Sequence, residues 1–275
     1  MSEHSSTGSS NAGIRLVAFD LDDTLAPSKS RVDPEMAELL GQLIQRVPVC
    51  IISGGRFEQF SMQVLDALDD SAGLENLHLM PTCGTQYYEW SGSEWTQVYS
   101  EELTEAQKSA VIEALTAGEA ALGLNDPQTW GPKIEDRGSQ ITFSALGQSA
   151  PVDAKKAWDP SGAKKDALRQ FVAERVPELE VRSGGSTSVD ITRKGVDKAY
   201  GMEKIKTKLG LANEDILFVG DRLDEGGNDY PVKAMGINCV AVQEWEQTAI
   251  FVRGLVATFD LQRTAAAVGV APAGY

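Results

Sequence analysis

The residues best suited to chemistry are carboxylates that directly follow short apolar runs. The run Leu16 to Phe19 is followed at once by Asp20-Leu21-Asp22-Asp23-Thr24. Because side chains alternate along an extended chain, Asp20 and Asp22 are expected to leave the strand on the same side. Two like charges so close are unfavourable unless a cation or a proton lies between them, which favours Mg²⁺ with hard oxygen ligands. The alternative is a plain turn after a strand.

Two further groups follow later apolar runs. Ser53-Gly54-Gly55-Arg56 comes after Val49 to Ile52, and its glycines would let backbone N–H groups approach an oxyanion. The alternative there is a helix N-cap serine with flexible neighbours.

Gly220-Asp221 comes after Ile216 to Val219 and begins an acidic loop that runs to Asp229. A cation explains this loop better than a plain turn, although chance loops are also acidic in a chain with 40 Asp and Glu residues.

Lys198 is the fourth candidate, near the start of a predicted helix. A cation there can neutralise charge that develops on phosphate and on a nucleophile, although a single lysine is otherwise a surface residue. The presence of all four candidates together favours a functional site over chance. Asp20, Ser53 and Asp221 mark the carboxyl ends of separate predicted parallel strands, where ligands bind in open α/β folds. His4 and His78 are the only histidines, so few residues are available as the base of a Ser/His or Cys/His mechanism.

The elements that position these residues begin with a βαβ unit. Asp33-Pro34 pairs an N-cap with proline at the first helical position, and apolar residues recur at helical spacing from Met36 to Ile44 before the next apolar run. After Asp197 a helix and two apolar strands resume the same pattern. Strand, helix and strand in this order predict a parallel sheet.

The middle of the chain has a different pattern, of hairpins and long helices. Hairpins are expected at Tyr87–Trp90 with Trp95–Tyr99 and at 133–136 with 140–146, and helices at 104–122 and 163–176. The predicted fold class is therefore α/β, with a Rossmann-like core at 14–88 and 192–275 and an inserted α+β domain at 89–191. Residues 1–13, rich in Ser, Gly and Asn, are expected to form a disordered tail.

Composition excludes several classes of partner. A net charge of −15 argues against binding to nucleic acid or an anionic membrane, since such binding depends on Lys and Arg. The apolar runs are too short to cross a membrane, and the first residues lack the features of a secretory signal. The three cysteines form no CxxC pair and are odd in number, which fits a reducing cytoplasm. The sequence does not indicate the oligomeric state.

The four motifs, in this order, resemble those of the haloacid dehalogenase-like (HAD) phosphohydrolase superfamily. Asp20-Leu21-Asp22-Asp23-Thr24, Ser53, Lys198 and Gly220-Asp221 with Asn228-Asp229 carry the resemblance. The insert resembles the large α/β cap of the subgroup that contains sugar phosphatases and eukaryotic-type phosphomannomutases. The resemblance extends from Leu16 to about Val242.

The resemblance implies a role for each core residue. Asp20 would attack phosphorus in line, and Asp22 would protonate the leaving oxygen and later activate water. The implied phosphate ligands are Ser53, Gly54 and Lys198. These roles agree with the expectation that phosphoryl transfer depends mainly on positioning and charge neutralisation.

Mg²⁺ is the implied cofactor. Its implied ligands are the carboxylate of Asp20, the backbone carbonyl of Asp22, and Asp221. Asn228 and Asp229 would support this metal site.

The resemblance also implies that the cap binds a small phosphorylated substrate of the phosphosugar class. The implied substrate-binding residues are Lys29, Arg137, Lys155, Ser188 and Asp190. Lys29 and Lys155 stand where the mutase pattern has arginine, and Gln148 replaces another arginine without charge. Arg137 has the alternative role of a β-turn residue.

These departures decide the predicted activity. Arginine binds phosphate with a bidentate fork that lysine cannot copy, so the grip on a distal phosphate is weaker than in the mutase pattern. The sequence therefore predicts a Mg²⁺-dependent phosphatase of a phosphosugar, acting through a phospho-aspartate, and a phosphomannomutase-like mutase as the alternative. A noncatalytic binding module would be expected to lack Asp20 or Asp22, and both are present.

Overall fold

The computed structural model describes residues 13–69 and 73–267. The chain divides into two compact units, one formed by Met1–Gly84, Tyr88–Thr96 and Asp197–Tyr275 and the other by Thr85–Tyr87 and Gln97–Val196. Residues 89–96, expected in the insert, thus group with the first unit. Residues 85–87 and 192–196, expected in the core, group with the second unit. The tail expected at 1–13 lies outside the described residues except for Gly13.

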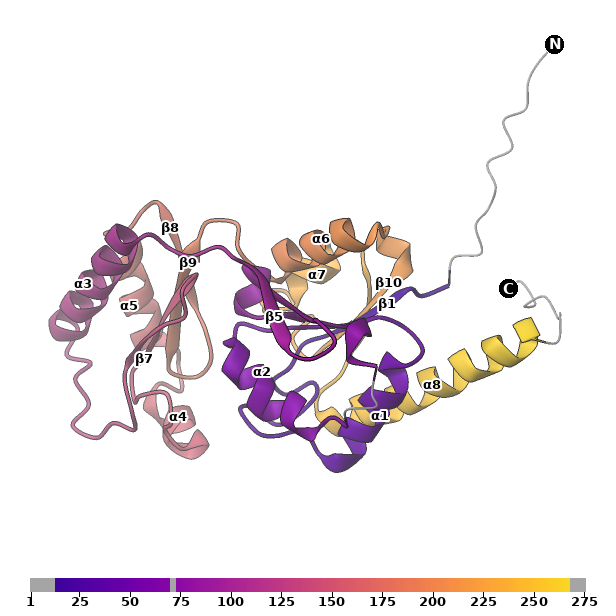
Figure 1. Ribbon diagram of the computed structural model, residues 1–275. Coiled ribbons are helices and arrows are strands. Elements are labelled where there is room, and N and C mark those ends of the chain that lie inside the picture. Colours follow the sequence, from indigo (N-terminus) through magenta and orange to yellow (C-terminus); the bar gives the residue numbers. More distant parts are fainter. Residues whose placement is uncertain (1–12, 70–72, 268–275) are drawn as a thin grey trace, which may run out of the picture. The chain divides into compact units, whose positions relative to one another are not determined.

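Most of the first unit is built around a seven-stranded sheet (Figure 1). In spatial order its strands are β11 (Asn238–Ala241), β10 (Ile216–Gly220), β1 (Leu16–Phe19), β2 (Val49–Ile52), β3 (Leu77–Met80), β4 (Gln86–Trp90) and β5 (Trp95–Ser100). The strands from β11 to β3 are parallel, and β4 is antiparallel to β3. The predicted α/β fold with a parallel core sheet is confirmed.

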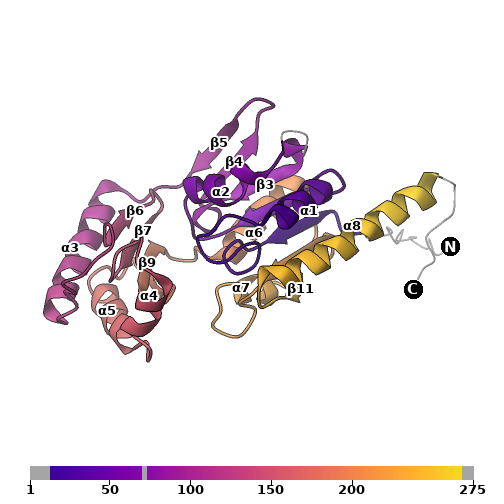
Figure 2. The same ribbon diagram turned by 90° about the horizontal axis from the view of Figure 1, so that it is seen from below.

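Helices cover both faces of this sheet. They are α1 (Pro34–Ile44), α2 (Phe57–Gln63), α6 (Lys198–Leu209), α7 (Tyr230–Ala234) and α8 (Trp245–Ala267), with short 3₁₀ turns η1 (Leu65–Ala67), η3 (Leu74–Asn76), η4 (Thr82–Gly84) and η5 (Asn213–Asp215). Helices α1 and α8 lie side by side on one face, and α6 and α7 lie on the other (Figures 1 and 2). Helix α1 begins as predicted, because Asp33 accepts a hydrogen bond from the Glu35 N–H at 2.9 Å.

The parallel register brings the ends of three strands to one edge. Phe19 of β1 pairs with Ile51 of β2 and with Val219 of β10. The residues that come next, among them Asp20 and Asp221, therefore emerge together at the carboxyl edge of the sheet.

The second unit is an α+β layer with its own hydrophobic core. Its antiparallel sheet has the order β6 (Ile134–Asp136), β7 (Gln140–Ser144), β9 (Ser188–Arg193) and β8 (Leu179–Ser183), and its helices are α3 (Glu105–Ala121), α4 (Val152–Trp158) and α5 (Ala163–Ala173). Helices α3 and α5 pack on this sheet. Thr104 and Gln107 form a capping box that starts α3.

The sequence pattern assigns the hairpin β4–β5 to the insert. In the structure the hairpin instead extends the core sheet. Leu79 of β3 pairs with Tyr88 of β4, and the Tyr88 ring stacks on Phe57 with centroids 4.1 Å apart. Alternation of side chains indicates a strand but not which sheet it joins, and this contact decides it. Within the described ranges, we find no helix with the length and apolar character needed to cross a membrane.

Candidate active site

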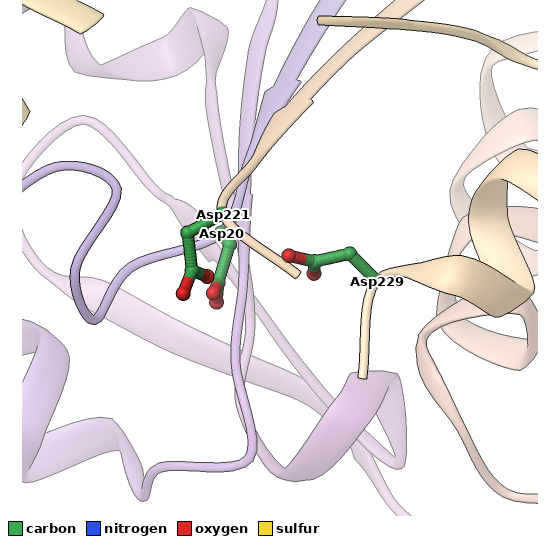
Figure 3. A group of neighbouring side chains, drawn as sticks. All are labelled: Asp20, Asp221 and Asp229. Carbon is green, nitrogen blue, oxygen red and sulfur yellow. The ribbon is translucent and has the colours of Figure 1, made fainter. Parts of the chain in front are cut away.

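Three carboxylates meet at the carboxyl edge of the core sheet. Oxygen atoms of Asp20, Asp221 and Asp229 lie within 4.8 Å of one another. Figure 3 shows that Asp20 follows β1, that Asp221 follows β10, and that Asp229 points at both from the start of α7. Two of these side chains, Asp20 and Asp229, are buried. Such a cluster needs positive charge beside it.

Asp20 is fixed by the backbone around it. Its own N–H donates to the Val219 carbonyl at 3.0 Å, which ties the loop after β1 to β10. Its Oδ1 atom accepts a hydrogen bond from the Leu21 N–H at 2.7 Å. The residue is only 3% exposed, so its carboxylate is largely shielded from solvent.

Lys198 supplies the cation of the cluster. Its Nζ atom lies 2.5 Å from Oδ1 of Asp20 and 2.6 Å from Oδ1 of Asp229. Lys198 is the first residue of α6, and the N-cap Asp197 fixes this helix start by accepting the Tyr200 N–H at 3.0 Å. The structure thus brings Lys198 to Asp20, as the order of motifs predicts.

The pKa values reflect this crowding. Burial raises the pKa of Asp20, the Lys198 ammonium opposes that effect, and the Asp229 charge adds to it, leaving the pKa well above its usual range. Burial and the Asp229 charge also raise the pKa of Asp221. Burial alone would lower the pKa of Lys198, but the charges of Asp20 and Asp229 raise it above its ordinary value.

The charge balance of the cluster fits a divalent cation. Three carboxylates share one ammonium group, so the fully ionised cluster carries an excess of negative charge. All the available donor atoms are hard carboxylate oxygens, the type that Mg²⁺ prefers. Asp229 accepts on both oxygens, from Lys198 at 2.6 Å and from the Arg222 N–H at 3.0 Å, whereas Lys198 and the Leu21 N–H both contact Oδ1 of Asp20. Asp20 and Asp221 are therefore the members best placed to take a metal.

Gly220 makes the approach of Asp229 possible. A Cβ atom at this position would lie 2.4 Å from Oδ2 of Asp229, far inside contact distance. The glycine of Gly220-Asp221 is therefore required for packing as well as for the end of the strand. Asn228, predicted to support the metal, lies exposed in the same loop.

The carboxylate of Asp22 is not a member of this cluster, which corrects the expectation that the Asp20 and Asp22 carboxylates meet. Alternation fails because the chain does not stay extended: Asp22 forms an isolated bridge with Ala26, and Asp23 has a left-handed φ of 62°. The Asp22 carboxylate instead accepts from Gln59 at 2.9 Å and from Gln63 at 3.3 Å, both on α2. Reasoning from the sequence missed these glutamines, whose only signal is their spacing of four on the helix after Ser53.

The Ser53–Gly55 loop is held by the turn that follows β3. Oγ of Ser53 accepts the Gly55 N–H at 3.1 Å. The N–H groups of Thr82 and Cys83, both with positive φ, donate at 2.9 Å to the carbonyls of Gly55 and Ser53. Ser53 is thereby buried at the same edge as Asp20, and Gly54 leaves open space where a Cβ would stand.

The residues predicted to bind substrate lie in both units. Lys29 is in the first unit, where its N–H donates to Oδ1 of Asp22 at 2.7 Å and its φ is 58°. The others lie in the second unit. Ser188 and Asp190 alternate along β9 and so share a face, and both lie close to the position that a Cβ of Gly184 would occupy.

Arg137 and Lys155 have other partners within the second unit. The Nε and Nη2 atoms of Arg137 donate to one oxygen of Glu135 at 2.9 and 2.7 Å. Nζ of Lys155 donates to the Gln148 carbonyl at 3.1 Å. Glu135 was not predicted from the sequence, although its spacing of two from Arg137 in a hairpin could have indicated a pair on one face.

Asp190 is held by two side chains that the sequence did not single out. Its Oδ1 atom accepts from Gln140 at 3.0 Å and from Thr142 at 2.8 Å, and both donors lie on the neighbouring strand β7. The alternation of polar residues on β7 is the signal that could have identified them.

The sequence of the chain matches known proteins over most of its length. The sequence model of the family "Eukaryotic phosphomannomutase" matches residues 36–253, a range that includes Ser53, Lys198, Asp221 and Asp229. The chain is 25% identical over 241 residues to phosphomannomutase 1 of Homo sapiens, and the match covers 84% of this chain and 89% of the human protein.

Solved structures show the same fold. N-terminally truncated, IMP-bound IMP-nucleotidase of Plasmodium falciparum matches with a TM-score of 0.64 and 14% identity, over 88% of this chain and 68% of that one. A haloacid dehalogenase-like hydrolase from Bacteroides thetaiotaomicron matches with a TM-score of 0.59 and 13% identity, over 88% of this chain and 100% of that one. The predicted HAD fold is confirmed.

Proposed function

The chain belongs to the eukaryotic phosphomannomutase family, and we propose that it is a phosphosugar mutase whose covalent nucleophile is Asp20. The observation that carries the proposal is the buried carboxylate of Asp20, 2.5 Å from Lys198 and beside Asp221. The relatives favour the mutase over the phosphatase that the sequence predicts first. Both activities share the same first chemical step.

In that step an oxygen of Asp20 bonds to phosphorus while the bond from phosphorus to the sugar oxygen breaks, and Asp22 gives that oxygen its proton. In the return step the phosphoryl group passes from phospho-Asp20 to the free hydroxyl of a hexose monophosphate, which gives the bisphosphate, and Asp22 takes the hydroxyl proton. Ser53, the backbone N–H of Gly54 and the ammonium of Lys198 bind the phosphoryl oxygens. Their charge and direction stabilise the transition state.

The acidic cluster is the proposed Mg²⁺ site. The carboxylates of Asp20 and Asp221 and the backbone carbonyl of Asp22 would hold the ion, with Asp229 and the exposed Asn228 supporting. A bound Mg²⁺ ion supplies positive charge that offsets the charge of the transferring phosphoryl group. Lys198 keeps the Asp20 side chain aligned in this site through its contact of 2.5 Å, and Asp229 holds Lys198 in place at 2.6 Å.

The second unit is proposed to act as a substrate-binding cap. Lys29, Arg137, Lys155, Ser188 and Asp190 are the proposed contacts with the sugar and its distal phosphate. Asp190, fixed by Gln140 and Thr142, would accept hydrogen bonds from sugar hydroxyls. The proposed location of the protein is the cytoplasm, in keeping with cysteines that form no disulfide in the part of the chain the structure describes.

One observation favours hydrolysis as a second candidate. The guanidinium of Arg137 is paired with Glu135, the ammonium of Lys155 donates to the Gln148 carbonyl, and Gln148 itself carries no charge. Less cationic charge is then available for a distal phosphate than in the mutase pattern. A hexose monophosphate held weakly would leave before it takes the phosphoryl group from Asp20, and water would hydrolyse phospho-Asp20 instead.

A coupled assay separates the two activities. Hexose 1-phosphate is supplied with Mg²⁺ and catalytic hexose 1,6-bisphosphate, and formation of the 6-phosphate and release of inorganic phosphate are followed in parallel. We expect isomerisation to exceed phosphate release by at least about tenfold, because the return step regenerates the sugar phosphate. The reverse ratio would establish the phosphatase. If Asp20→Asn retained both reactions, Asp20 would not be the nucleophile.

A further inference from the structure

The carboxylate of Asp22 is held on both of its oxygens. Oδ1 accepts the backbone N–H of Lys29 at 2.7 Å and the amide of Gln63 at 3.3 Å, and Oδ2 accepts the amide of Gln59 at 2.9 Å. The three donors come from two segments, the loop after β1 and helix α2. A carboxylate bound in this way has little freedom to rotate about its side-chain torsions.

Gln63 anchors this arrangement in the core. It is completely buried, and its amide nitrogen also donates to the Ser30 carbonyl at 2.8 Å. Its amide oxygen is buried with no hydrogen-bond partner among the described residues, which costs free energy. An aliphatic side chain would avoid that cost, so the contribution of this amide lies in the hydrogen bonds that it donates.

Gln59 connects Asp22 to the Ser53–Gly55 loop. A Cβ atom at Gly55 would lie 2.3 Å from Oε1 of Gln59, so the Gln59 amide lies directly against the Gly55 backbone. The same Gly55 donates its N–H to Oγ of Ser53 at 3.1 Å. The side chain that orients Asp22 is therefore packed on the loop proposed to bind phosphate, and a shift of either one would displace the other.

We propose that Gln59 is a positioning residue that fixes the direction of the Asp22 carboxylate relative to the phosphate-binding loop. This inference rests on the proposed function, in which Asp22 passes the proton to and from the sugar oxygen. Gln63 provides the buried support for the same carboxylate. Loss of the Gln59 donor leaves Asp20, Lys198 and the acidic cluster intact but allows Asp22 to turn away from the reacting oxygen.

The test uses p-nitrophenyl phosphate, whose leaving group departs without a proton, in the presence of Mg²⁺. Phosphorylation of Asp20 by this substrate does not need Asp22, whereas transfer of the phosphoryl group onward to water does. Gln59→Leu keeps the size of the side chain and removes the donor. Steady-state turnover is measured together with the fraction of enzyme carrying phosphate, found by acid quenching and mass spectrometry.

We expect Gln59→Leu to lower turnover by at least about tenfold while the phosphorylated fraction rises above that of the wild type. Glu58→Leu is the matched control on α2, because its side chain is 72% exposed, and both quantities should stay at the wild-type level. A fall in turnover without a rise in the phosphorylated fraction, or unchanged turnover, would overturn the positioning role.

Failure of the proposed function would give a different result. In that case no phosphorylated Asp20 would be found in the wild type or in Gln59→Leu, and Asp20→Asn would retain activity. The positioning role of Gln59 would then be wrong together with the proposed function. If Asp20→Asn abolishes the phosphorylated species and Gln59→Leu behaves as Glu58→Leu does, the mechanism stands and the inference about Gln59 alone is wrong.

Discussion

Nζ of Lys198 lies 2.5 Å from Oδ1 of Asp20, and the two side chains are only 2% and 4% exposed. The same ammonium donates to Asp229 at 2.6 Å. One buried cation therefore serves two buried carboxylates that come from opposite ends of the chain. Because the pair joins the end of β1 to the start of α6, the contacts that hold the proposed nucleophile also contribute to the stability of the core.

Replacing Lys198 should show this double role. Lys198→Met leaves Asp20 and Asp229 buried without their cation, and the loss of one partner of a buried pair typically lowers the free energy of unfolding by about 3–5 kcal/mol. Turnover should be lost as well. Urea unfolding in chelator measures the stability, with Lys208→Met as control, because Lys208 forms a more exposed pair with Glu89 and should cost at most about 1 kcal/mol. Equal losses in the two variants would contradict the prediction.

Gly220→Ala tests the approach of Asp229. The added Cβ would lie 2.4 Å from Oδ2 of Asp229, so this carboxylate must move away from Lys198. We expect a loss of stability of about 1–3 kcal/mol and a drop in activity. Gly254→Ala is the matched control, because a Cβ at this position meets nothing within 4 Å. Gly254 lies in helix α8, where alanine should raise the free energy of unfolding by about 0.5–1 kcal/mol. Similar thermal unfolding temperatures for both variants would show that Asp229 moves at no cost.

Much of the core could be predicted because its signals are local. The apolar runs before Asp20, Ser53 and Asp221 form the parallel strands expected, since buried parallel strands read as continuous hydrophobic segments. Parallel order then places their ends at one edge. Lys198 reaches Asp20 because α6 begins at that residue.

What could not be predicted depends on contacts between distant segments. The hairpin β4–β5 alternates like any antiparallel pair, and only pairing with β3 and the Phe57–Tyr88 stack assign it to the core sheet. The direction of the Asp22 carboxylate depends on the left-handed turn at Asp23 and on Gln59, which is 37 residues further along the chain. Neither position forms a pattern with its sequence neighbours.

His78 predicts a pH dependence of stability that is separate from the acidic cluster. Burial, together with the charge of Lys208 and against that of Glu89, lowers the pKa of His78 from 6.5 to about 4. Between these values the unfolded chain binds more protons than the folded one, so this contribution to stability is fully present above pH 6.5 and is lost as the pH falls toward 4.

His78→Leu should remove that dependence. From pH 6.5 to pH 5, protonation in the unfolded state should cost the wild type about 2 kcal/mol, whereas the variant should lose less over the same range. Urea unfolding at a series of pH values between 5 and 8, in chelator, measures the slope. Parallel curves for the two proteins would mean that His78 is protonated equally in the folded and unfolded states.

Mg²⁺ should stabilise the folded protein, because the acidic cluster exists only in the folded state. Saturation at about a hundred times the dissociation constant adds roughly 2.7 kcal/mol to the free energy of unfolding. Asp221→Asn removes one of the two carboxylates best placed for the ion and should abolish most of the gain, measured as the rise in thermal unfolding temperature when Mg²⁺ replaces chelator. Asp224→Asn is the matched control, because Asp224 is exposed in the same loop and pairs with Arg222, so this variant should keep the full rise. If both variants respond to Mg²⁺ as the wild type does, the ion binds elsewhere, and the cluster of Asp20, Asp221 and Asp229 is held together by Lys198 alone.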